Sequence, residues 1–370
     1  MFKRTGIIQQ ADIEHFYATK EALLFFNSLG FEVIDNKFGE LIKNLSKKDE
    51  SPVLFTKKVQ EYLIVVLNTG VGYIVDDNGG YKQFDDAVLP KIYKEKWLAC
   101  YEYDYDLLAL QSNFLSLFEE RKHLFSDNIL GEFSIVDNLL FLIYKETITR
   151  VSENSHSLWS LSVADLGRHY FKSEKRWEKG EVDKFLGIYK MVLWVLLKNG
   201  LIIGLDIETG KIVHEIKEPV EYPLAYTLLD KELNNFYGKP SMLDSVKGKI
   251  IGIAQSGIAG SFPSYYEIDL DIPIVQLKIM QRPNDDFQGF HADGGAIGYA
   301  WPFDNDYIYL CNYRDYKLAL FNRMAKQIDW VHQMEVDPAK KTFIIKMEVH
   351  GNRWYVLDNS KTLYVYEREA

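Results

Sequence analysis

A long loop at residues 282–295 contains the pair of residues best suited to chemistry. His291 and Asp293 are two positions apart and can form a proton relay, and Gly294 and Gly295 let a ligand approach the backbone. No nucleophile elbow or phosphate-binding spacing accompanies the pair. A catalytic pair, a binding loop and turn residues with a structural role therefore all stay open. The aromatic residues that flank the pair are Phe287, Phe290 and Trp301.

A second unusual pattern alternates tyrosine with acid: Tyr101, Glu102, Tyr103, Asp104, Tyr105 and Asp106. On a strand, the three tyrosines would point to one face and the three carboxylates to the other. Carboxylates on one face would lie roughly 6–7 Å apart and would repel one another. The acidic face is either a solvated surface or a recognition strip for a cationic partner.

Dense charges of both signs occupy residues 172–184, which include Arg176 and Trp177. The preceding segment, His169–Phe171, reads as the last strand of a fourth sheet, and strand periodicity is lost after it. We therefore expect an exposed loop. Trp177 either packs back onto the protein or forms part of a contact surface.

Metal and cofactor chemistry have no signature in this sequence. The eight histidines are scattered without an HExxH or His-x-His motif, although ligands from separate strands could still converge. Cys100 and Cys311 lie far apart in strand-like runs, so we expect two buried thiols in a reducing cytosol. We predict no metal and no cofactor.

The elements that must position these residues are short strands, seen best at residues 201–216. Apolar residues alternate there with small or polar ones, as in a strand with one buried face. Asp206 can accept hydrogen bonds from turn amides with help from Thr209, and Gly210 can adopt positive φ. Further apolar runs lie upstream, at residues 185–189 and 191–197. Four such strands form a small sheet that needs neighbouring sheets to cover its faces.

Weaker copies of this unit recur, each marked by an apolar residue followed by Asp or Asn: Ile34-Asp35, Val75-Asp76, Leu205-Asp206, Ile268-Asp269 and Phe321-Asn322. Asp35 and Asp76 are 41 residues apart. Asp76 and Asp206 are separated by three steps of about 43 residues, which matches the period of propeller blades.

The triplets Asn199-Gly200-Leu201, Gly204-Leu205-Asp206 and Thr209-Gly210-Lys211 resemble the repeat of PQQ-like (quinoprotein-type) and WD40-like β-propellers. The resemblance implies an all-β chain, folded over residues 1–370 as a single closed propeller of four-stranded antiparallel blades. Counting turns predicts eight blades, with seven as the alternative. The resemblance is nearly silent on function. Many quinoprotein enzymes stack the cofactor near a vicinal disulfide, which this chain lacks, so no quinone is inferred.

Three segments complete the predicted architecture. Residues 1–10 would pair beside the C-terminal run, Thr362–Glu367, and close the ring, which removes two exposed sheet edges. Residues 217–240 would form an insertion with a short helix at residues 228–236. Residues 282–295 would form a long loop.

Composition excludes several classes of protein. Of the 370 residues, 47% are hydrophobic and 14% aromatic, which suits a globular β protein, and no apolar run is long enough to span a membrane. The N-terminal residues lack the apolar segment of a secretory signal. A net charge of −10 without a basic cluster argues against nucleic-acid binding and favours a basic protein partner. We expect a cytoplasmic protein that is a monomer by itself.

These observations favour a non-enzymatic propeller that binds one protein. One concrete version is an immunity or antitoxin-like protein that covers a basic toxin. The alternative is an enzyme or small-ligand sensor with its site at the central channel, where side chains from several blades would converge.

Overall fold

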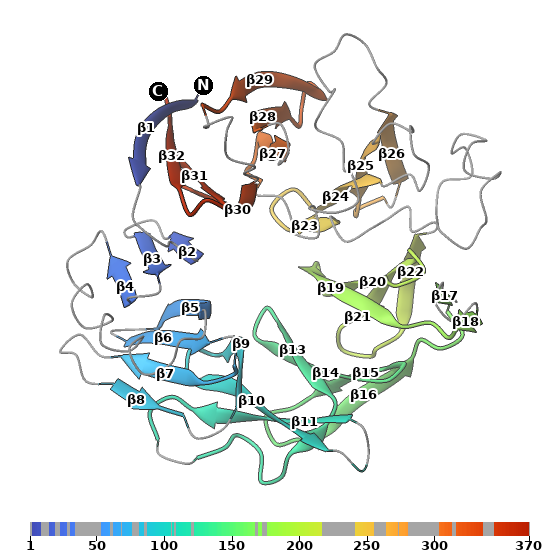
Figure 1. Cartoon of the computed structure of the whole chain (residues 1–370). Helices are drawn as coiled ribbons and strands as arrows, with labels where there is room; N and C mark the ends of the chain where they lie inside the picture. The colour runs from blue at the N-terminus through green and yellow to red at the C-terminus, as the bar shows by residue number, and fades with distance from the viewer. Residues whose placement is uncertain are drawn as a thin grey trace. The chain divides into compact units, whose positions relative to one another are not determined.

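The computed structural model confirms the all-β class, since strands but no helix occur among the residues it describes (Figure 1). In the same part of the chain, no helix has the length and apolar character that crossing a membrane requires. The strands form two compact units, whose boundary falls within β9. The described residues are 2–8, 15–18, 23–27, 30–33, 53–59, 62–67, 69–75, 81–84, 87–104, 106, 109–119, 122–166, 169–171, 176–216, 241–254, 264–272, 274–279, 303–312, 316–335 and 344–369.

The first unit contains four antiparallel sheets, which we call A, B, C and I. Sheet A comprises β1 (Phe2–Ile8), β30 (Ile344–His350), β31 (Arg353–Asp358) and β32 (Leu363–Arg368); sheet B comprises β2 (His15–Ala18), β3 (Leu23–Asn27) and β4 (Gly30–Val33); sheet C comprises β5 (Val53–Val59), β6 (Tyr62–Leu67), β7 (Gly72–Val75) and β8 (Tyr81–Gln83); sheet I comprises β27 (Tyr307–Asn312), β28 (Lys317–Asn322) and β29 (Gln327–Gln333).

The second unit contains sheets D to H, of which F is a two-stranded ribbon. Sheet D comprises β9 (Val88–Tyr93), β10 (Trp97–Asp104), β11 (Ala109–Ser116) and β12 (Ile129–Leu130); sheet E comprises β13 (Glu132–Val136), β14 (Leu139–Tyr144), β15 (Thr147–Val151) and β16 (Ser157–Ser162); sheet F comprises β17 (His169–Phe171) and β18 (Arg176–Glu178); sheet G comprises β19 (Val182–Tyr189), β20 (Val192–Leu197), β21 (Ile202–Asp206) and β22 (Ile212–Ile216); sheet H comprises β23 (Met242–Asp244), β24 (Lys249–Ala254), β25 (Ser264–Asp269) and β26 (Ile274–Ile279).

The two chain ends meet in sheet A, as the sequence predicts. β1 runs antiparallel to β32 from Phe2 opposite Arg368 to Ile8 opposite Leu363 (Figure 1). An ion pair of 2.8 Å between Arg4 Nη2 and Glu335 Oε2 also ties β1 to the segment after β29. The N-terminal segment therefore supplies the fourth strand that β30–β32 lack.

The turn after β21 forms as predicted from its residue types. Asp206 Oδ1 accepts hydrogen bonds from the backbone N–H and the hydroxyl of Thr209, at 2.8 and 2.7 Å. Gly210 has a φ of 69° and lies against the ring of Trp159 in sheet E. The indole N–H of Trp159 donates to Ile207 O at 2.8 Å, so this turn also joins sheets E and G.

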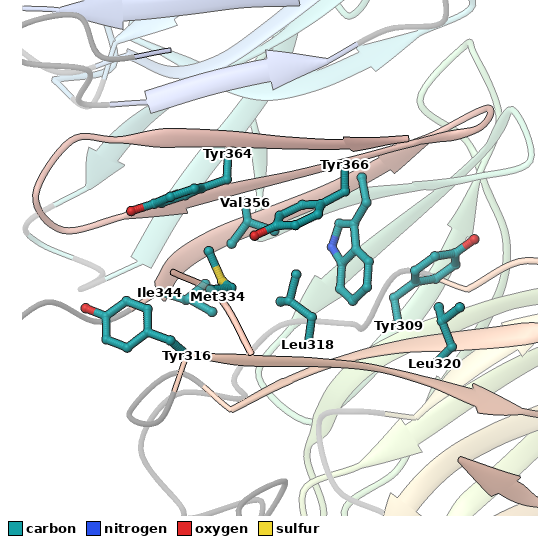
Figure 2. Close-up of a cluster of buried hydrophobic side chains, with 10 residues drawn as sticks. Tyr309, Tyr316, Leu318, Leu320, Met334, Ile344, Val356, Tyr364 and Tyr366 are labelled. Carbon is teal, nitrogen blue, oxygen red and sulfur yellow. The ribbon is translucent and has the colours of Figure 1, made fainter. Parts of the chain in front are cut away.

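Neighbouring sheets bury their apolar faces against one another, which is the expected source of order in a chain of small sheets. In Figure 2, side chains from β28 face those from β31 and β32. Similar cores join sheet E to sheet G and sheet G to sheet H. The core between sheets I and A consists of Tyr309, Tyr316, Leu318, Leu320, Met334, Ile344, Trp354, Val356, Tyr364 and Tyr366.

His332 makes the junction between sheets I and A sensitive to pH. Its ring stacks on Trp330 and meets Tyr366 edge-on. Burial, and then the charge of Arg4, lower the pKa of His332, while Glu335 opposes the shift. Since an unfolded histidine has a pKa near 6.5, the folded state favours the neutral ring.

We therefore expect the stability contributed by neutral His332 to be complete above about pH 6.5 and to decline as pH falls toward the lowered pKa. The melting temperature measured from pH 8 to pH 5 should fall more steeply for the wild type than for His332→Phe, which keeps a ring against Trp330. Parallel pH profiles would show that His332 does not contribute.

Three lysines link neighbouring sheets by the same device. In each case, a lysine on an edge strand of one sheet donates to a backbone carbonyl at an edge strand of a neighbouring sheet. Lys91 reaches Phe133 O at 2.8 Å, and Lys184 reaches Ser241 O at 2.6 Å. Lys346 in sheet A donates to Phe16 O in sheet B.

Replacing Lys346 should weaken the junction between sheets A and B. Its ammonium also bonds to Glu348 at 2.7 Å and lies 4.8 Å from the centre of the Phe16 ring. Lys346→Met should lower the free energy of unfolding in urea by about 2 kcal/mol, the usual range for a hydrogen-bonded charge. The matched control is Lys122→Met, which removes an exposed ion pair with Glu119 and should leave stability unchanged. Equal stability of the two variants would contradict the linking role.

Two predictions for the chain around sheet F were wrong: the loop at residues 172–184 and the sheet to which His169–Phe171 belongs. Residues 172–184 are not simply a loop, because β18 (Arg176–Glu178) and the start of β19 fall within them. His169–Phe171 is a strand, but it pairs with β18 and not with sheet E. The fourth strand of sheet E is β16, because the polar segment Thr147–Val151, which was not predicted as a strand, forms β15 between β14 and β16. Because charged residues occur along this two-stranded ribbon, its sequence lacks the alternation of apolar and polar residues that identifies a half-buried strand.

Several predicted segments lie outside the described residues. They are the insertion at residues 217–240 with its helix at 228–236, and the loop at 282–295.

Candidate functional site: a cluster of turns on sheets G and H

Three tight turns meet at one end of sheets G and H. The β19–β20 turn is joined to the β25–β26 turn by an ion pair of 2.6 Å between Lys190 Nζ and Asp271 Oδ1. The β23–β24 turn is joined to the β25–β26 turn by a hydrogen bond from Leu270 N to Gly248 O at 3.0 Å. We call Lys190, Met191, Val246, Asp271 and Ile272 the turn cluster.

Close packing holds the turn cluster together. Gly248 has a φ of 61°, and a Cβ there would lie 2.4 Å from the ring of Tyr189. The ammonium of Lys190 lies 5.2 Å from the centre of the same ring. The carboxylate of Asp271 raises the pKa of Lys190, and Lys190 in turn lowers the pKa of Asp271. Both groups are therefore charged at neutral pH.

The turn cluster exposes an unusual amount of apolar surface. Met191, Val246 and Ile272 are 54%, 83% and 65% exposed. Single exposed apolar residues are ordinary, but several that adjoin often mark a protein-binding surface. Met191, Val246 and Ile272 belong to three turns that contact one another directly. Such a surface suits contact with an apolar segment, and Asp271 holds Lys190 in its charged, non-nucleophilic form.

The backbone of the β19–β20 turn would suit other residues better. Lys190 and Met191 both have positive φ, 46° and 64°, a conformation that favours Asn and Gly. The equivalent turns at Lys94-Glu95 and Asp137-Asn138 have the same conformation with polar residues only. Met191 therefore stands out as an apolar residue in a turn conformation that suits polar residues and glycine.

The tyrosine–acid pattern lies partly on β10, as predicted. Tyr101, Glu102, Tyr103 and Asp104 end that strand, which pairs with β11 so that Glu102 faces Gln111. Glu102 and Asp106 are exposed, and Tyr101 is half-buried. Tyr105 lies outside the described residues.

The other predicted binding residues are separated or not described. Arg176 and Trp177 lie on β18, opposite Phe171 and Tyr170 of β17. Phe287, His291, Asp293 and Trp301 lie outside the described residues, so the proposed proton relay stays a prediction. None of these residues is part of the turn cluster.

A polar row on β30 is relevant to the alternative of an enzyme or ligand sensor. Glu348 accepts from Lys346 at 2.7 Å and lies 3.5 Å from His350 Nε2. The three residues alternate along the strand, so they share one face. Lysine, glutamate and histidine in contact are groups that can exchange protons.

The cysteines do not suggest a reactive centre. Neither cysteine forms a disulfide; Cys100 is buried, as predicted, whereas Cys311 is half-buried and not fully buried as predicted. Burial raises the pKa of Cys311 to about 12, so its reactive thiolate is scarce at neutral pH. Among the described residues, no group of three or more His, Cys, Asp or Glu side chains could hold a metal ion.

The sequence pattern did not point to the turn cluster. The available signal was an apolar residue inside each short turn, as in Asp244-Ser-Val-Lys-Gly248 and Leu270-Asp-Ile272. Nothing in the sequence shows that these turns adjoin, because the contact depends on the packing of sheet G against sheet H.

Comparison with known proteins concerns the fold. No family model and no curated protein sequence matches the chain. Among solved structures, Sqt1 of Saccharomyces cerevisiae, a WD40 propeller, is 11% identical with a TM-score of 0.55, and the match covers 100% of this chain and 98% of Sqt1. The computationally designed Ika8 protein is 10% identical with a TM-score of 0.55 and 97% coverage of both chains. BamB of Moraxella catarrhalis is 11% identical with a TM-score of 0.44, covering 85% of this chain and 96% of BamB.

At these identities the likeness establishes architecture alone. The chain has a β-propeller fold, as its repeat predicts. The fold does not determine the function, because propellers host unrelated activities.

Proposed function

We propose that the protein is a non-enzymatic propeller that binds another protein. The observation that carries this proposal is the turn cluster, where three exposed apolar side chains belong to turns that contact one another at the ends of two sheets. Burying them against a partner would contribute about 3–6 kcal/mol, enough to dominate a specific interface. The propeller fold is compatible with a protein-interaction scaffold.

We further propose that residues 1–370 form one closed ring of eight blades, with β1 completing the last blade. Sheets A to E and G to I would be the blades, and sheet F an addition to the second unit. The pairing of β1 with β32 and the bond from Lys346 to Phe16, which joins the last sheet to the first, support this arrangement. A seven-bladed ring would leave one of these eight sheets outside.

The partner is proposed to be a basic protein. The net charge of −10 would attract a cationic surface and raise its rate of association. An immunity or antitoxin-like protein that covers a basic toxin, such as a nuclease, is one form of this function. We propose that it acts in the cytoplasm and is a monomer until it meets its partner.

Co-purification tests the proposed function. The tagged protein, expressed in its native cell, should retain one basic protein in stoichiometric amount at low salt, identified by mass spectrometry. Salt should weaken the complex, because the attraction is partly electrostatic. If no stoichiometric protein is retained at low salt, the proposal loses its main support.

The polar row on β30 favours one alternative function, an enzyme or small-ligand sensor whose site lies on the innermost strands. A screen of small anions and sugars by melting temperature tests it. A ligand that stabilises the wild type but not Glu348→Gln would favour the alternative over protein binding.

A further inference from the structure

We propose that the turn cluster is the docking site for an apolar segment of the basic partner, with Asp271 receiving one of its cations. This inference rests on the proposed function, since it names the surface and the chemistry of recognition. No motif in the sequence marks these residues.

The surface is preorganised for binding. The ion pair of Lys190 with Asp271, the hydrogen bond from Leu270 to Gly248 and the packing of Gly248 on Tyr189 fix the three turns relative to one another. A surface already held in place loses little conformational entropy when a partner docks. The apolar side chains of the cluster therefore need little rearrangement.

The turn cluster itself is neutral, and it is the net charge of −10 on the whole chain that favours a cationic partner. Lys190 is neutralised by Asp271, and that carboxylate is still 52% exposed as a side chain. An arginine or lysine of the partner can approach it beside the three apolar residues. Lys247 adds a positive charge at the edge of the cluster, so the basic residues of the partner should face away from it.

A second copy of this chain is a poorer occupant. Two molecules that each carry a net charge of −10 repel one another, most strongly at low salt. A stable dimer also buries about 800 Å² on each partner. Three side chains and one ion pair supply less than that, but they suffice as the centre of an interface with a protein of opposite charge.

The test uses three fluorescent peptides of about 18 residues: an amphipathic Leu/Lys helix, an amphipathic Leu/Glu helix and a Ser/Lys peptide. Their binding to the full chain is measured by fluorescence anisotropy at low salt. The variant Val246→Ser/Ile272→Ser removes apolar surface without changing charge. The matched control, Met324→Ser/Val331→Ser, changes one residue in the β28–β29 turn and one on β29, which are 90% and 45% exposed.

We expect the Leu/Lys peptide to bind the wild type and the control equally, and the cluster variant about tenfold more weakly or worse. The Leu/Glu and Ser/Lys peptides should bind weakly to all three proteins. All three proteins should melt at similar temperatures, because the substituted side chains are exposed.

Equal binding of the Leu/Lys peptide to all three proteins, or no binding at all, would overturn the inference. If the protein prefers the Leu/Glu peptide, the proposal that its partner is basic is wrong. Sedimentation velocity that shows a dimer lost in the cluster variant would assign the surface to a second copy instead. If the native partner is retained equally by the cluster variant, the docking site is wrong but the proposed function stands; if neither protein retains a partner, the function itself fails.

Discussion

Removing residues 1–8 should lower the free energy of unfolding by at least about 3 kcal/mol, a large part of the roughly 5–15 kcal/mol by which a folded domain is stable. β1 pairs with β32 along almost its whole length, so its loss removes a ladder of backbone hydrogen bonds. It also exposes the edge of β32 to other chains. The result is measured by urea unfolding followed by circular dichroism, with light scattering to detect aggregation.

A control separates the strand from the ion pair between Arg4 and Glu335. Arg4→Gln removes the bond to Glu335 while keeping the backbone of β1. Glu335 is 80% exposed, so this substitution should lower stability by less than about 1 kcal/mol. If the truncated protein unfolds at the same urea concentration as Arg4→Gln, the strand contributes nothing beyond a surface contact.

The strand pattern was predictable wherever one face of a sheet is buried. The apolar runs at residues 185–189 and 191–197 match β19 and β20 to within three residues at each end. The pairing of the chain ends was also predictable, because a strand without a sequence neighbour needs a distant partner. Short or polar strands were missed, including β2, β15 and β23, because two or three apolar residues do not establish a period.

The candidate site was much less predictable than the fold. Residue chemistry drew attention to acids, tyrosines and a histidine, which are common in loops for structural reasons. The turn cluster consists of Met, Val and Ile, which sequence reasoning assigns to the core. The exposure of these side chains follows from the positive φ values in the turns, as at Met191 and Gly248, and from the packing of three separate turns. Such contacts between sheets have no local signature in the chain.

Gly210→Ala should lower the free energy of unfolding by about 3 kcal/mol or more, by two separable effects. A non-glycine residue at positive φ costs about 1–2 kcal/mol. The added Cβ would also lie 2.6 Å from Cδ2 and Cε3 of Trp159, which cannot move freely because its indole N–H is bonded to Ile207 O. Overpacking of this kind costs about 1–3 kcal/mol.

Gly351 provides the matched control, since its φ of 60° is nearly that of Gly210 and no atom lies within 4 Å of its added Cβ. Gly351→Ala should therefore show the backbone effect alone, about 1 kcal/mol. The difference between the two variants in urea unfolding measures the contact between sheets E and G. Because apolar faces covered by neighbouring sheets hold this fold together, Gly210→Ala should also change the near-ultraviolet circular dichroism of Trp159. Equal destabilisation of the two variants would mean that sheets E and G do not press on each other at this turn.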